Sequence, residues 1–129
     1  MMTQKVTKPA ILLDMKWNRI RINKETLYLL GKPKYIEILV SPKNRGFIVR
    51  SAPDGKNSHA ITTSHLTNKN GFELSSCAFI REIQNITDTV ESPMSYRIHG
   101  TMNPEGNAAV FLIDDAVPLH CRKDDILYA

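Results

Sequence analysis

Alternating apolar and polar positions predict short strands along most of the chain. The clearest case is Arg19-Ile20-Arg21-Ile22, which puts two isoleucines on one side of a strand and two arginines on the other. Other runs with strand character are Ala10 to Leu13, Tyr35 to Val40, Arg45 to Arg50, His59 to Leu66, Phe72 to Leu74, Tyr96 to Gly100 and Ala108 to Ile113. The pattern therefore predicts a mainly β (α+β) protein.

Two short helices are predicted between the strands, each marked by a capping residue. Asn23 is a favourable N-cap for residues 24–30, because its side-chain oxygen accepts an orphan backbone N–H. Gly31 supplies the left-handed residue that ends this helix. Ser75 is expected to cap a second helix over residues 76–86. Its apolar positions at helical spacing are Phe79, Ile80, Ile83 and Ile86.

The remaining segments have turn chemistry. Asn18 is expected in the loop before the Arg19 strand, since asparagine tolerates the left-handed conformation of a tight loop. Ser41-Pro42-Lys43-Asn44 and Asn103-Pro104-Glu105-Gly106 each place a proline in a predicted hairpin turn. Asn70-Gly71 is a strong signal for a further hairpin turn.

The same order of elements occurs twice. Each half runs strand, loop, strand, capped helix and hairpin, and Phe72-Glu73-Leu74 matches Ile20-Arg21-Ile22. We predict a first repeat over residues 9–52, a linker over 53–58, a second repeat over 59–114 and a partly disordered tail over 115–129. An isolated repeat would leave hairpin edges open, so we expect the two copies to pack as a pseudo-two-fold barrel.

Charge is distributed unevenly over a chain whose formal net charge is +4. Residues 1–60 hold 12 Lys/Arg and 4 Asp/Glu, which is +8, whereas residues 61–129 hold 5 and 9, which is −4. The asymmetry favours a polyanion as the partner of the first half. The alternatives are an ordinary solvated face, or pairing with the acidic half of a neighbouring copy.

The candidate nucleic-acid-binding residues lie in the first repeat. Arg19 and Arg21 are expected at the centre of the binding face, because Ile20 and Ile22 between and beside them belong to the core. We expect Trp17 to be a partly buried anchor rather than a base-stacking residue. The full set is Lys16, Trp17, Arg19, Arg21, Lys24, Lys32 and Lys34.

No catalytic or metal-binding motif is found in the sequence, so neither an enzyme nor a cofactor is expected. His59, His65, His99 and His120 lack ligand spacing, and Cys77 and Cys121 are expected to be reduced thiols, a residue type that is commonly a small buried hydrophobe. No apolar run approaches the roughly 20 residues that span a bilayer. We therefore expect a cytoplasmic protein without a membrane partner.

The segment DMKWNRIRINKETLYLLGKPKYIEILVSPKNRGFIVRS, within Ala10 to Ala52, resembles the swapped-hairpin family of AbrB and MraZ transcription regulators and MazE-type antitoxins. Asn18-Arg19 stands for the family's Gly-Arg, Leu30-Gly31 for its Leu-Gly, and Glu37-Ile38-Leu39-Val40 for its hairpin strand. Asn23 stands where the family has proline, and two tandem copies look most like MraZ. The resemblance implies a swapped-hairpin barrel and a DNA contact at Arg19.

These observations predict a DNA-binding transcription regulator of bacterial or phage type. The alternative is a protein-interaction or antitoxin-like module, in which the basic face meets an acidic protein or a second copy of the chain. An enzyme on a related barrel ranks last, because no reactive constellation is found.

Overall fold

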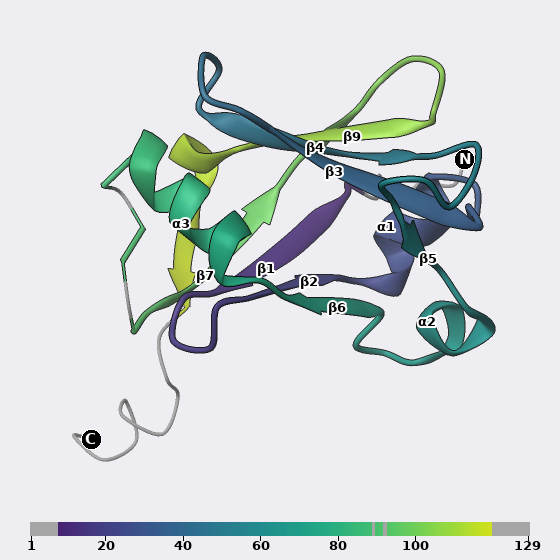
Figure 1. Ribbon diagram of the computed structural model, residues 1–129, viewed down its shortest axis with the longest axis horizontal. Coiled ribbons are helices and arrows are strands. Elements are labelled where there is room, and N and C mark those ends of the chain that lie inside the picture. Colours follow the sequence, from purple (N-terminus) through teal and green to yellow (C-terminus); the bar gives the residue numbers. More distant parts are fainter. Residues whose placement is uncertain (1–7, 89, 92, 120–129) are drawn as a thin grey trace, which may run out of the picture.

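The computed structural model describes residues 8–88, 90–91 and 93–119, and two antiparallel sheets dominate it (Figure 1). The first sheet contains β1 (Ala10–Asp14), β2 (Arg19–Ile22), β6 (Phe72–Ser75), β7 (Ser95–His99) and β10 (Val117–Leu119). The second contains β3 (Tyr35–Ser41), β4 (Gly46–Ser51), β5 (His59–Ala60), β8 (Thr101–Met102) and β9 (Ala108–Leu112). Their orders are β10-β7-β1-β2-β6 and β5-β3-β4-β9-β8. The predicted mainly β fold is confirmed.

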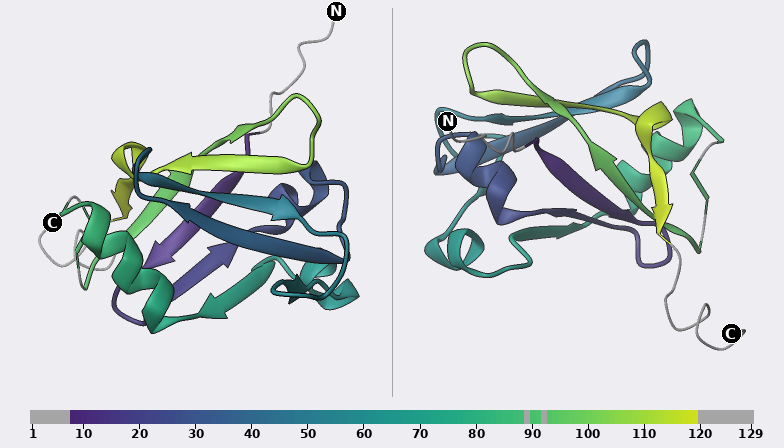
Figure 2. Two further views of the ribbon diagram at one scale, coloured as in Figure 1. Left: turned by 45° about the horizontal axis from the view of Figure 1, so that its top comes forward. Right: turned by 180° about the vertical axis from the view of Figure 1, so that it is seen from behind.

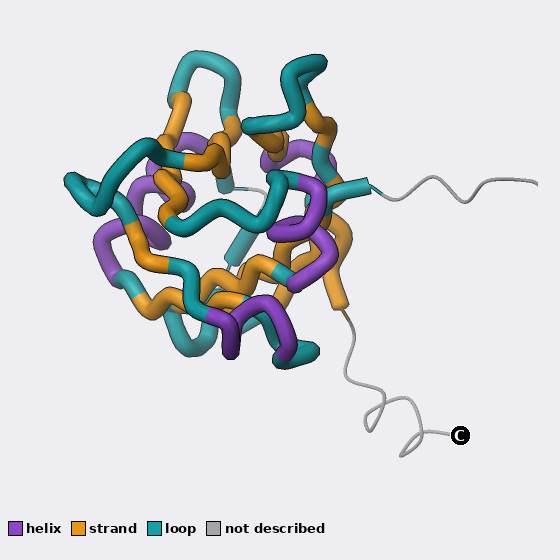
Figure 3. Tube along the Cα trace, turned by 90° about the vertical axis from the view of Figure 1, so that its right-hand side faces the viewer, coloured by secondary structure: helices purple, strands orange, loops and turns teal. Residues whose placement is uncertain are grey.

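The helices lie at the two ends of the paired sheets. They are α1 (Lys24–Leu29), α2 (Thr63–Thr67), α3 (Cys77–Ile86) and a short 3-10 helix over Ile113–Asp115. Figure 1 shows α3 at one end and α1 at the opposite end, with α2 beside α1. Figure 3 views the molecule from the end that carries α1 and α2. We refer to this side as the α1 end.

Local capping explains both longer helices. The Oδ1 atom of Asn23 accepts a hydrogen bond from the backbone N–H of Thr26 at 2.9 Å, as its position predicts. Gly31 then has a φ of +83°, which ends the helix. In the second half the cap is Ser76, whose Oγ accepts from the N–H of Phe79 at 3.1 Å. The predicted cap at Ser75 was wrong by one residue, because Ser75 is still paired in β6.

The predicted strand His59 to Leu66 was wrong beyond its first two residues. Only His59–Ala60 form β5, and Thr63–Thr67 form α2. Thr62 and His65 make a capping box, in which the Thr62 N–H donates to Nδ1 of His65 at 2.9 Å. Asn70-Gly71 consequently connects a helix to a strand and not two strands. These local side-chain hydrogen bonds stabilise the start of a helix in a segment whose residue types had predicted a strand.

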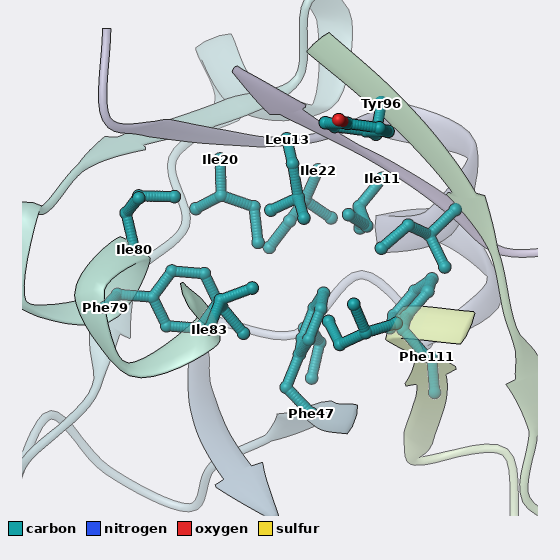
Figure 4. Packing of buried hydrophobic residues seen from close by; sticks show 14 of the residues in the cluster. Ile11, Leu13, Ile20, Ile22, Phe47, Phe79, Ile80, Ile83, Tyr96 and Phe111 are labelled. Carbon is teal, nitrogen blue, oxygen red and sulfur yellow. The ribbon is translucent and has the colours of Figure 1, made fainter. Parts of the chain in front are cut away.

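The core lies between the two sheets (Figure 4). Ile20 and Ile22 are fully buried, as the alternation on β2 predicts. Phe47 of β4 stacks on Phe111 of β9 with ring centroids 5.3 Å apart, and meets Phe79 of α3 edge-on at 5.4 Å. Aromatic pairs in these geometries stabilise a core beyond the area they bury. The same cluster therefore joins both halves of the sequence.

Two ladders pair matching strands of the predicted repeats. In β2–β6, Arg21 lies opposite its counterpart Glu73, while Ile20 lies opposite Leu74 and Ile22 opposite Phe72. In β4–β9, Ile48 lies opposite Val110, which are counterparts when the two proline turns are superimposed. Both registers are those that an approximate two-fold axis through the central pairs would produce.

The chain bends directly from the first sheet into the second at Gly100, and the described residues show no closed barrel. Gly100 separates β7 in the first sheet from β8 in the second, and a Cβ there would overlap with the Val110 carbonyl oxygen. Within the described part of the chain, no ladder joins one sheet to the other. Figure 2 shows the strands of one sheet crossing those of the other.

The first residues of the predicted disordered tail are ordered. Val117–Leu119 form β10 (Figure 2). This strand pairs with β7, and Pro118 lies opposite Tyr96. Proline is accepted here because β10 is an edge strand and needs no donor on its free side. Residues 120–129, which include His120 and Cys121, lie outside the described residues.

Candidate polyanion-binding surface

The outer side of β2 carries Arg19 and Arg21, as the sequence predicts. Because Ile20 and Ile22 are fully buried, the strand directs both guanidinium groups away from the core. Each arginine, however, forms an ion pair with a carboxylate on a neighbouring strand. The two pairs differ in burial, and this difference separates their roles.

The pair at the turn end of β2 is the more buried one. Nη2 of Arg19 lies 2.9 Å from Oδ2 of Asp14, whose side chain is only 11% exposed. Oδ1 of Asp14 also accepts from the N–H of Trp17 at 3.4 Å. Nε of Arg19 is itself buried. Arg19 therefore compensates a buried charge and holds the turn, which leaves less of it for an external partner.

The second pair is more exposed and connects the two halves of the chain. Nη2 and Nε of Arg21 each lie 2.6 Å from Oε2 of Glu73, and the two side chains are 30% and 34% exposed. Both groups remain in contact with water, so the pair contributes little to stability. The Arg19 and Arg21 side chains are similarly exposed, at 32% and 30%, so the two pairs differ in the burial of their carboxylates.

Ion pairing within the chain absorbs part of the charge asymmetry. Four ion pairs are found among the described residues, and two of them, Arg21–Glu73 and Arg45–Asp114, join the basic half to the acidic half. The sequence suggested such pairing between neighbouring copies, and here it occurs inside one chain. The lysines and arginines that form no ion pair among the described residues therefore define the candidate surface better than the net charge of each half does.

The turn before β2 presents Lys16 and Trp17 to solvent. Trp17 is 63% exposed, so the expected partly buried anchor was wrong. Nζ of Lys16 lies 5.4 Å from the centroid of the Trp17 ring, a cation–π contact. Asn18 closes the turn with a φ of +51°, as predicted for this position. An exposed aromatic ring beside a cation has the properties of a surface on which a base stacks.

Lys24, Lys32 and Lys34 lie at the other end of β2. Lys24 begins α1, and Lys32 and Lys34 follow it before β3. Nζ of Lys32 lies 5.8 Å from the ring centroid of Tyr28 on α1. The four residues of β2 separate these lysines from the Lys16 turn by roughly 13 Å of strand. The predicted set therefore divides into a turn group and a group at the α1 end.

Two cations from the second half join the group at the α1 end. Arg97 of β7 and Lys69 of the loop before β6 border a surface pocket of about 180 Å³ next to Arg21. The lining residues are Ala10, Ile11, Leu12, Arg21, Asn23, Lys69, Asn70 and Arg97. The predicted set omitted both cations. The alternation Tyr96-Arg97-Ile98 signals an outward Arg97, but its place beside β1 depends on a long-range strand pairing.

The described residues contain neither a candidate metal cluster nor a membrane-spanning helix. No group of three or more His, Cys, Asp or Glu side chains lies close enough within them to hold a metal ion. Cys77, the first residue of α3, is an exposed free thiol and not the small buried residue that was expected. In this part of the chain, no helix is long and apolar enough to cross a membrane.

Comparison with known proteins yields no relative for this chain. No protein-family model matches it, and neither the curated proteins nor the solved structures yield a match. The function must therefore be argued from the surface itself.

Proposed function

We propose that the protein is a DNA-binding transcription regulator of the AbrB/MraZ-like type. One observation carries the proposal: cations from both halves of the chain gather at the α1 end and have no acidic partner within the described part of the chain. Among the described residues, none of their side chains forms an ion pair. They are Lys24, Lys32, Lys34, Lys69 and Arg97.

The strand pairing supports the swapped-hairpin part of this proposal. β1 of the first half pairs with β7 of the second, and β5 of the second half pairs with β3 of the first. Each half thus completes a sheet of the other. We infer a pseudo-two-fold arrangement of two repeats, the arrangement that the resemblance to tandem regulators implies.

The outer side of the first sheet offers the groups that DNA binding needs. Lysines and arginines neutralise backbone phosphates, and arginine also pairs with guanine in the major groove. Arg21 lies between the lysine group and the exposed Lys16–Trp17 turn. In our proposal the lysines, Arg21 and Arg97 hold phosphates, while the Lys16–Trp17 turn contacts base edges.

A binding titration against salt tests the proposal. Binding of a fluorescein-labelled duplex is measured by anisotropy at salt concentrations from about 50 to about 300 mM, a range that includes physiological salt. The logarithm of the association constant should fall linearly with the logarithm of the salt concentration. Several phosphate contacts give a slope several times that of a single contact. Absence of binding at the lowest salt would exclude the regulator function.

A protein-interaction module is the second candidate, and one feature of the second sheet favours it. Leu39, Ile48 and Val110 lie side by side on the outer face of β3, β4 and β9. Leu39 and Val110 are each 37% exposed, and Leu112 nearby is 40% exposed. Such an apolar row is typical of a contact surface. If the duplex does not bind, L39D/V110D becomes the first variant to compare in partner-binding and self-association assays.

A further inference from the structure

The pocket on the outer side of the first sheet combines three cations with an apolar floor. Arg21 and Arg97 lie opposite Leu12 on its two sides, so the three residues form one row across β2, β1 and β7. Adjacent strands are about 4.8 Å apart, which places the two arginine backbones roughly 10 Å apart. Two long arginine side chains at this backbone separation can both donate hydrogen bonds to one small anion above Leu12.

The loop before β6 is held tightly at the same place. Gly71 has a φ of +67°, and a Cβ there would overlap with the carbonyl oxygen of Ile22. The N–H of Asn70 donates to Oδ1 of Asn68 at 2.9 Å. The loop therefore packs directly on the end of β2, and this close approach brings Lys69 and Asn70 to the pocket.

Asn23 adds a fixed amide to the pocket. Its Oδ1 accepts from the N–H of Thr26 at 2.9 Å and from the Thr26 hydroxyl at 2.6 Å. With the oxygen engaged in capping α1, the Nδ2 group remains to donate. Fixed donors favour an anion with several acceptor oxygens.

The pocket lining is positively charged and includes no carboxylate. Arg21, Lys69 and Arg97 line it, whereas no Asp or Glu does. Arg21 also forms an ion pair with Glu73 on β6, but the side chains of Lys69 and Arg97 form no hydrogen bond or ion pair with any described residue. Arginine matches the oxygens of phosphate in a bidentate fashion.

We propose that this pocket is a phosphate-binding site, and that its occupant is one phosphodiester of a nucleic-acid backbone. Small-molecule sites usually enclose about 300–1,000 Å³. A pocket of about 180 Å³ suits one phosphate group better than a whole nucleotide. The inference deepens the proposed function and rests on it for the source of the phosphate.

The test compares two pairs of neutralised cations. K69Q/R97Q removes two charges from the pocket, and K43Q/R81Q removes two exposed charges from the β3–β4 turn and from α3, outside the pocket. With the labelled duplex, the magnitude of the salt slope should fall by about one in the pocket variant beyond any change in the control. Affinity at 0.1 M salt should fall roughly eightfold relative to the control.

A further variant changes the pocket without removing a cation. L12E places a carboxylate on the floor between Arg21 and Arg97, at a half-buried outer position of β1. It should weaken duplex binding as strongly as K69Q/R97Q, whereas L12M should leave binding unchanged. Thermal unfolding of each variant shows whether it is folded. In one outcome, the affinity of the wild type for the duplex falls steeply with salt while K69Q/R97Q and K43Q/R81Q show equal salt slopes. That result would overturn the phosphate-binding pocket and leave the regulator function standing.

Inorganic phosphate separates the pocket from the regulator function. In amide NMR spectra, millimolar phosphate should shift Leu12, Asn23 and Asn70 in the wild type but not in K69Q/R97Q. If the duplex fails to bind while these shifts occur, the site is retained with free phosphate as its source. If neither ligand acts on these residues, the proposal is wrong.

Discussion

The two ends of β2 carry arginines on the same face of one sheet but in different surroundings. At the turn end, Arg19 contacts a nearly buried Asp14, and part of its own guanidinium is buried. At the α1 end, Arg21 contacts a Glu73 that is about as exposed as itself and borders the cationic pocket. Alternation along the strand determines the direction of each arginine. The burial of its carboxylate partner determines whether the arginine is needed for folding or is available to bind an external anion.

The largest effect is expected at Gly71, which holds the pocket loop against the end of β2. Gly71→Ala introduces a Cβ that overlaps with the Ile22 carbonyl oxygen and a residue that disfavours positive φ. We expect a loss of about 3 kcal/mol or more in the free energy of unfolding, measured with urea.

Gly106 provides the matched control for this substitution. Its φ is +75°, but a Cβ there would meet nothing within 4 Å. Gly106→Ala should therefore cost only about 1 kcal/mol. Equal losses at both glycines would contradict the close packing of the pocket loop.

Arg19→Ala should be the next most damaging change. It leaves the nearly buried Asp14 carboxylate without its partner, so we expect a loss of about 1–3 kcal/mol in urea unfolding. The burial of Asp14 is the reason why we expect a larger loss than for an arginine whose partner is exposed.

A double-mutant cycle with Asp14→Ala isolates the pair. If Arg19 acts through Asp14, the double variant should be more stable than the sum of the single losses predicts. Duplex binding should keep its salt slope in Arg19→Ala. A fall in slope with unchanged stability would move Arg19 from the structural to the binding group.

Arg21→Ala should weaken duplex binding more than it lowers the stability of the fold. Its ion pair with Glu73 is partly exposed, so we expect a loss below about 1 kcal/mol in urea unfolding. The magnitude of the salt slope for duplex binding should fall by about one. A larger loss of stability than in Arg19→Ala would remove the contrast between the two ends of the strand.

Glu73→Gln is the smallest and most diagnostic change. It removes the carboxylate that engages Arg21 and keeps a side chain of the same size, so stability should change by only about 0.5 kcal/mol. Because Arg21 is released and a repulsive charge is lost, duplex affinity should rise a few-fold at low salt. Weaker binding would show that Glu73 positions Arg21 instead of restraining it.

Local chemistry in the sequence determined several features of the protein. Alternation put Ile20 and Ile22 in the core, Asn23 capped α1, and Asn18 and Gly31 adopted positive φ values. Each depends on sterics or hydrogen bonds within a few residues, which the sequence displays directly. The same reasoning missed α2. There the Thr62–His65 capping box and the strand propensity of the segment are both local effects, and the sequence alone did not show which of them was stronger.

The tertiary structure alone decided which charges meet. Lys69 and Arg97 reach the pocket beside Arg21, and Glu73 reaches Arg21 itself, through pairings that connect residues more than 45 positions apart. Net charge per half could not reveal this, because part of the asymmetry is neutralised across β2–β6. Strand partners are selected by burial of the whole core, a free energy summed over both sheets, and no local pattern encodes that sum.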